Sequence, residues 1–198
     1  MFIRRTILAS CLACAGLSAV PAAAQQDQQG QPGQPNPPTA AQPPADPKEM
    51  GAAEVVGLLM ETCVHFAGDP AGLRSWLAQQ GAPEIPPEGR AMFLGKRTGK
   101  AYDASEENLR LALVSADDGS CSAYAEFADP ALTAKYLEEA LRQSKDAFTT
   151  QGDQADQQDP SLQHRDYRVT IGSKPWLILL TTTTGQGKIQ AALTMRPG

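Results

Sequence analysis

Two runs of alternating residues around a tight turn constrain the fold of this chain more than any other feature. The first run, at 108–116, places Leu109, Leu111 and Leu113 on one side. The second run, at 121–127, places Cys121, Ala123, Ala125 and Phe127 on one face. Between them stands Asp117-Asp118-Gly119, in which Asp118 and Gly119 suit the positive φ angles of a hairpin turn. A two-residue period is typical of strands with one buried face, so the segment predicts an antiparallel hairpin.

Helical periodicity dominates on both sides of this hairpin. It predicts helical segments at residues 48–67, 70–80, 90–95 and 130–148. Asp69 and Asp129 are suited to cap the second and fourth segments, since each is followed by a proline that fits the first helical position. The segment at 90–95 is expected to be a single turn. The fourth is the one long central helix, and its apolar stripe is expected to end at Phe148.

The C-terminal part of the chain is predicted to be strands. A polar loop is expected at 149–160, followed by strands at 164–172, 176–184 and 188–195 and a hairpin turn at 185–187. The strand at 176–184 is apolar on both faces at its start, which predicts an interior position in the sheet. Tight hairpins join antiparallel strands. The predicted class is therefore α+β, an antiparallel sheet of about five strands with the N-terminal helices and the long central helix packed on it.

The N-terminus has the composition of a secretory signal. Two arginines precede an apolar run at 6–20 and a stretch of alanines. This pattern predicts a cleaved signal peptide at residues 1–24, cut between Ala24 and Gln25. The alternative is lipidation of Cys11, which follows a lipoprotein-like Leu-Ala-Ser. The very short apolar run before Cys11 favours the later cut. The protein is therefore expected to be periplasmic or secreted, without a membrane span after signal removal.

Residues 25–47 are rich in glutamine and proline, and alanine is their only apolar residue. Such a segment buries too little apolar surface to offset its ordering entropy, which predicts a disordered tether. Residues 48–198 are then one α+β domain. Removal of residues 1–24 takes away two arginines and no acid, which leaves 15 basic and 22 acidic side chains and a net charge of −7. No cluster of Lys and Arg stands in the sequence, so nucleic acid is not an expected partner.

Two cysteines remain after signal removal, and export places them in an oxidising compartment. Cys63 lies on the inward stripe of the first helix, and Cys121 shares a strand face with alanines that leave room for a helix. These positions predict a disulfide between Cys63 and Cys121. A loop of that size is worth up to ~4 kcal/mol in the loop-closure account.

Two sharper interpretations of the cysteines were weighed against the disulfide. Cys63 and His65 fit a nucleophile–base pair poorly, because positions two apart on a helix point to different sides. A metal site made of Cys63, Cys121, His65 and His164 would have no close-spaced ligand pair on one element. The sequence also contains no nucleophile elbow, phosphate-binding loop or dinucleotide fingerprint. We therefore assign no catalytic residue, no metal site and no cofactor.

The order of features along the chain resembles an uncharacterised family of small exported proteins of Gram-negative bacteria. These features are a signal, a polar segment, a helix with one cysteine and the Asp117–Cys121 stretch "DDGSC". The resemblance covers roughly residues 60–195 and rests on "DDGSC" together with the upstream Cys63. This family carries no assigned activity. The resemblance therefore implies export and a disulfide, and it implies no mechanism.

These features favour a non-enzymatic binding or accessory module of the cell envelope. Its partner is expected to be a protein or envelope component, bound through the sheet or through the loop at 150–160. One alternative is a carboxylate-based hydrolase of envelope glycan, which requires two acids across a cleft, one of them with a raised pKa. Another is an enzyme inhibitor that presents a rigid loop on a disulfide-bonded scaffold.

Overall fold

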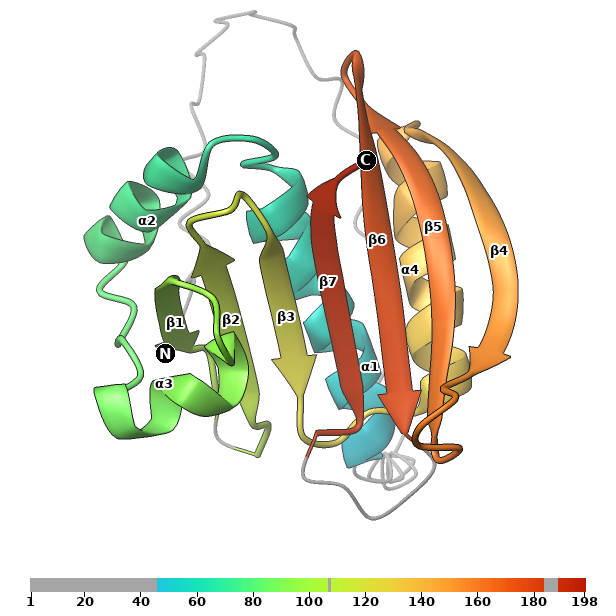
Figure 1. Cartoon of the computed structure of the whole chain (residues 1–198), viewed down its shortest axis with the longest axis horizontal. Coiled ribbons are helices and arrows are strands. Elements are labelled where there is room, and N and C mark those ends of the chain that lie inside the picture. Colours follow the sequence, from blue (N-terminus) through green and yellow to red (C-terminus); the bar gives the residue numbers. More distant parts are fainter. Residues whose placement is uncertain (1–45, 107, 184–188) are drawn as a thin grey trace, which may run out of the picture. The chain divides into compact units, whose positions relative to one another are not determined.

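An antiparallel sheet forms the centre of the structure (Figure 1). The computed structural model of the chain describes residues 46–106, 108–183 and 189–198. Within them, seven strands follow the order β1-β2-β3-β7-β6-β5-β4. They are β1 (Gly99–Asp103), β2 (Leu111–Ala116), β3 (Cys121–Ala125), β4 (Ala147–Ala155), β5 (Leu162–Ile171), β6 (Lys174–Thr183) and β7 (Ala191–Pro197). The predicted α+β class and antiparallel pairing are confirmed, and β6 is an interior strand as expected.

The predicted strand number of about five is wrong, because both edge strands were missed. β1 is short, and only Ala101 and Tyr102 are apolar in it. β4 replaces most of the polar loop predicted at 149–160. Its side chains are nearly all exposed, so the strand has no apolar face that a pattern could reveal. The backbone hydrogen bonds of the β5 ladder form it, and those bonds do not depend on side-chain polarity.

Helices cover the sheet unequally. They are α1 (Pro47–Leu58), continued by the π-helical turn η1 (Leu59–Val64), α2 (Pro70–Gln79), α3 (Pro87–Leu94) and α4 (Pro130–Ser144). α1 and α4 lie together behind the sheet in Figure 1, and α3 lies in front of its β1–β2 end. The carboxylates of Asp69 and Asp129 accept hydrogen bonds from the N–H groups of Gly72 and Leu132, as their capping roles predict.

Three helix boundaries differ from the prediction. α4 ends at Ser144 because Lys145 takes a left-handed conformation (φ 63°, ψ 17°). Phe148, which was expected on the helix stripe, therefore lies in β4. α1 begins at Pro47 behind the cap Asp46, so the predicted tether at 25–47 extends two residues too far. α3 has eight residues where a single turn was expected.

The main core lies between the sheet and the α1–α4 pair. Leu137 and Leu141 of α4 are fully buried there, as are Ile178 of β6 and Leu193 of β7. A smaller core under α3 contains Leu94, Ala101, Val114 and Ala116. Every residue of β2 is consequently buried, since helices cover both of its faces.

The Cys63–Cys121 disulfide is present and joins η1 to the first residue of β3. The two Cα atoms are 5.4 Å apart, and both cysteines are buried. Ala123 and Ala125 are also buried on this strand face, which agrees with the expected close approach of a helix. Because each sulfur is bonded to the other, neither serves as a nucleophile beside His65 or as a thiolate ligand of a metal.

The hairpin differs from the prediction in two residues, one after the end of β3 and one in the turn. β3 ends at Ala125, and Phe127, which was expected on the inward face, is 42% exposed. In the turn, Gly119 has the expected positive φ of 83°, but Asp118 does not adopt a positive φ. The carboxylate of Asp118 instead accepts hydrogen bonds from the N–H and hydroxyl groups of Ser120. This side-chain turn replaces the positive φ that was predicted at Asp118.

Several predictions fall outside the described residues. They are the signal peptide at 1–24 with its Ala24–Gln25 cut, the alternative lipidation of Cys11, the tether up to residue 45 and the hairpin turn at 185–187. Among the residues that the structure describes, no helix has the length and apolar character needed to cross a membrane.

Candidate functional site

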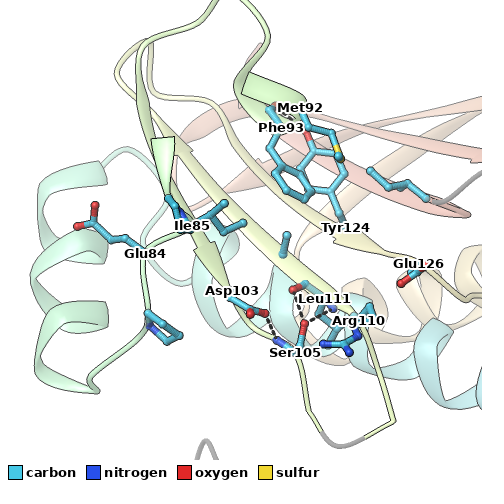
Figure 2. A pocket seen from close by; sticks show the side chains of 14 residues that line it. Glu84, Ile85, Met92, Phe93, Asp103, Ser105, Arg110, Leu111, Tyr124 and Glu126 are labelled. Carbon is cyan, nitrogen blue, oxygen red and sulfur yellow. Dashed lines mark hydrogen bonds between the residues drawn. The ribbon is translucent and has the colours of Figure 1, made fainter. Parts of the chain in front are cut away.

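A groove opens on the front face of the sheet, beside α3 (Figure 2). Its volume is about 620 Å³. One wall is the segment 83–86, the second is α3 with Met92 and Phe93, and the floor is formed by the ends of β1, β2 and β3. Cavities of this size are typical of small-ligand and peptide sites.

The inner wall of the groove is aromatic. The rings of Phe93 and Tyr124 meet edge to face, with centroids 5.4 Å apart, and the Tyr124 hydroxyl donates a hydrogen bond to the Phe93 carbonyl at 3.5 Å. Met92 stands beside them and is 64% exposed. Met92 and Phe127 are the large apolar side chains that the described part of the chain leaves exposed. An exposed apolar side chain next to aromatic rings often indicates a binding surface.

Charged side chains form the rim of the groove. Glu84 forms ion pairs with Lys100 and Arg90, and its hydrogen bond raises the pKa of Lys100. Arg110 and Glu126 lie at the opposite end, and the side chain of neither bonds to another described residue. These two groups offer a donor and an acceptor that are free to meet a ligand.

The walls of the groove are held by the backbone. Ile85 donates its N–H to Ala101 at 2.8 Å, and Asp103 donates to Pro83 at 2.9 Å, so the segment 83–85 runs along the outer edge of β1. Arg97, just after α3, binds the carbonyl of Phe93 and the hydroxyl of Ser120 in the hairpin turn. The aromatic wall is therefore positioned before any ligand arrives, which lowers the entropic cost of binding.

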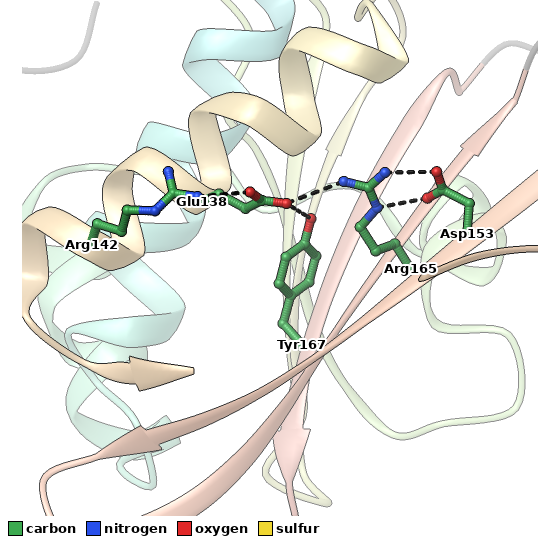
Figure 3. Close-up of polar contacts among 5 residues, drawn as sticks. All are labelled: Glu138, Arg142, Asp153, Arg165 and Tyr167. Carbon is green, nitrogen blue, oxygen red and sulfur yellow. Dashed lines mark hydrogen bonds and ion pairs between the residues drawn. The ribbon is translucent and has the colours of Figure 1, made fainter. Parts of the chain in front are cut away.

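A second polar cluster joins α4 to β4 and β5 (Figure 3). The guanidinium of Arg165 binds both carboxylate oxygens of Asp153 at 2.6 Å and reaches Glu138 at 3.2 Å. The carboxylate of Glu138 also accepts hydrogen bonds from the guanidinium of Arg142 and from the hydroxyl of Tyr167. Arg165 lowers the pKa of Asp153 by hydrogen bonding, and burial raises the pKa of Tyr167 to about 12. Each of these charged side chains has a partner, so the cluster holds β4 against α4 and β5.

The two histidines lie in different parts of the fold, and His164 lines the same pocket as Glu138, Asp153 and Arg165. His65 contacts the ring of Phe66, and His164 on β5 bonds to Thr181 and to Asp156. No group of three or more His, Cys, Asp or Glu side chains suited to a metal gathers in residues 46–106, 108–183 and 189–198. The metal site weighed for Cys63, Cys121, His65 and His164 is thus not assembled there.

We expect acid to weaken the turn after β4 through Asp156. Its pKa falls from 3.8 to about 2 because His164 and the N–H groups of Asp159 and Gln158 bond to the ionised carboxylate. A lowered pKa contributes stability that is complete above the ordinary value and is lost as the pH falls toward about 2. Urea midpoints of wild type and Asp156→Asn at pH 5 and pH 2.5 should converge at the lower pH. A constant gap would contradict this. The control is Glu88→Gln, at an exposed position whose side chain bonds to no other described residue.

The sequence indicated none of the groove residues. Phe93 falls in a stretch predicted as a single helical turn, and Tyr124 stands on the strand face opposite the one that contains Cys121. They meet because α3 packs across β1 and β2. One signal was present, since an aromatic ring between Ser122 and Glu126 on the polar face indicates that this face is also covered.

The chain matches no known family model, and comparisons with curated proteins and with solved structures found no match. The resemblance to exported Gram-negative proteins therefore stays a prediction.

Proposed function

We propose that the protein is a non-enzymatic, exported binding module whose groove holds an extended, proline- and aliphatic-rich segment of another envelope protein. The observation that carries this proposal is the preformed aromatic wall of Phe93 and Tyr124 with Met92 exposed beside it. Grooves lined by aromatic rings bind polyproline II segments, which lose little entropy because they are already extended.

The rim supports a peptide ligand. An extended peptide presents carbonyl oxygens and N–H groups along its length, and these need partners when its side chains enter an apolar groove. Arg110 can donate to such carbonyls, and Glu126 can accept from such N–H groups. Because both side chains are unpaired in the described structure, no internal bond has to break first.

Export is part of the proposal. A buried disulfide and the absence of a spanning helix from the described residues are compatible with a soluble protein in an oxidising compartment.

The hydrolase alternative stays a prediction. A glycosidase needs an acid with a raised pKa in its cleft. Burial raises the pKa of Glu54, and the nearby charges of Glu106 and Glu61 add to this shift. Glu54 stands on α1 and does not line the groove. Glu84 does line the groove, and its carboxylate forms ion pairs with the side chains of Lys100 and Arg90.

Binding of a probe peptide tests the proposal. The probe is a fluorescein-labelled decapeptide of alternating proline and leucine, with a Gly-Ser decapeptide as the control ligand. We expect saturable binding of the probe alone, measured by fluorescence anisotropy. Met92→Ala should weaken it by roughly tenfold, the effect of losing a well-placed apolar contact. Met92 is exposed, so its replacement does not threaten the fold.

The matched control is Gln143→Ala, at an exposed position on α4. It should bind the probe as wild type does. Equal affinities of wild type and Met92→Ala, or hydrolysis of envelope glycan by the purified protein, would sink the proposal.

A further inference from the structure

The outer edge of β4 has no partner in the described structure. β4 pairs with β5 on one side, and no other described residue bonds to its backbone. The opposite edge of the sheet is different, because the segment 83–85 pairs with β1. An uncovered edge presents a row of free N–H and C=O groups that can pair with another strand.

The first half of β4 is the part suited to pairing. Five consecutive residues, 147–151, are in regular register with β5, and the register shifts between Gln151 and Gln154. In the irregular second half, the side chain of Asp153 binds Arg165. An irregular, charged stretch of this kind disfavours pairing with a further strand. Residues 147–151 contain no proline and no charged side chain, so nothing in them blocks an added strand.

Unpaired positive charge lies beside this edge. The register places Thr149 of β4, Arg168 of β5, Leu177 of β6 and Arg196 of β7 in one row on the front face of the sheet. Both arginines line a pocket of about 440 Å³ that also includes Phe148 and Trp176. Neither arginine forms an ion pair or a side-chain hydrogen bond with another described residue, although Asp166 shares the face with Arg168.

We propose that an extended, acidic segment of a partner protein adds to the sheet along residues 147–151 and binds Arg168 through one of its carboxylates. Adjacent strands are about 4.8 Å apart, so a partner residue opposite Thr149 lies about 10 Å from the backbone of Arg168. An arginine and a glutamate side chain together span that distance. Strand addition supplies backbone hydrogen bonds, and the arginine selects the charge of the segment.

A second copy of this chain fits the edge less well. An edge of five residues buries far less than the roughly 1,000 Å² that a stable interface between two folded proteins requires. Pairing two β4 strands would also leave Arg168 of both copies without a carboxylate partner, because residues 147–151 contain no acidic side chain. A short acidic segment fits the five-residue length of the edge and complements the positive charge beside it. This site is separate from the groove beside α3 and does not depend on what the groove binds.

The test uses the full mature chain and a heptapeptide probe of sequence Thr-Val-Glu-Val-Glu-Val-Thr. We expect saturable binding in NMR titrations, with the largest amide shifts at residues 147–151. The same peptide N-methylated at alternate residues should not bind, because its hydrogen-bonding edge is blocked. A peptide with lysine in place of both glutamates should bind at least tenfold more weakly.

Arg168→Gln should weaken the acidic probe roughly tenfold and leave the lysine peptide unchanged. Lys96→Gln, which removes an exposed charge elsewhere, is the matched control and should bind as wild type. Equal binding of the N-methylated peptide, or largest shifts at residues remote from both β4 and Arg168, would overturn the inference. It would also fail if only vesicles of anionic lipid bound in an Arg168-dependent manner.

Discussion

Replacement of both Cys63 and Cys121 by alanine should lower the free energy of unfolding by about 3–4 kcal/mol. The disulfide closes a sequence separation of 58 residues, so its loss gives the unfolded chain much more freedom. It also joins η1 to β3 inside the main core, where both cysteines are buried. Urea unfolding monitored by tryptophan fluorescence should show a lower midpoint for the double variant.

Reduction provides the control for this experiment. Wild type treated with a thiol reductant under denaturing conditions and then refolded should lose a similar amount of stability, and the double variant should not respond to the reductant. Intact mass with and without alkylation establishes the state of the thiols in each sample. Unchanged unfolding of verified reduced wild type would show that the disulfide does not stabilise the domain.

Gly51→Ala should destabilise the protein by about 2–4 kcal/mol, a large effect for one methyl group. Gly51 lies on α1, where a Cβ atom would overlap the carbonyl oxygen of Phe127 and lie 2.9 Å from its carbon. Both are backbone atoms, so no side-chain rotation relieves the overlap. Near this contact, the N–H of Asp129 donates a hydrogen bond to the carbonyl of Lys48 at 3.0 Å. If α1 moved away to relieve the overlap, this hydrogen bond would break. Thermal and urea unfolding measure the loss.

Gly57 of the same helix is the matched control. A Cβ atom there would meet nothing within 4 Å, although the residue is half-buried. Gly57→Ala should therefore stabilise the protein by about 0.5–1 kcal/mol, the difference in helix propensity between the two residues. The two substitutions are chemically identical and should act in opposite directions. If both substitutions changed the free energy of unfolding in the same direction, the close contact with Phe127 would not be the reason that position 51 requires glycine.

Local chemistry was enough to predict the features whose causes are local. Asp69 and Asp129 begin their helices because a carboxylate and the N–H groups it caps are three residues apart in the chain. The hairpin before Cys121 followed from alternation and one turn, and Gly119 has the expected positive φ. The disulfide was predictable because only two cysteines lie outside the predicted signal peptide and both were expected on inward faces.

The errors lie where distant residues decide the structure. The sequence of β4 has no apolar residue between Phe148 and Ala155, and it is a strand because β5 pairs with it and Arg165 binds Asp153. Phe148 follows the helical spacing of α4, yet the left-handed Lys145 ends that helix before it. In both cases a pairing partner far along the chain outweighs the local periodicity.

The candidate sites show the same division between sequence and structure. The sequence by itself determined the class of the fold, the starts of α2 and α4 and the disulfide, because each depends on neighbours in the chain or on a pattern of burial. Only the tertiary structure decided that Phe93 faces Tyr124 and that Arg168 and Arg196 line one pocket. The two members of each pair are 31 and 28 positions apart in the sequence, so no local pattern joins them. Packing of α3 on the sheet and the order of its strands bring them together, and those arrangements are set by the burial of the whole core.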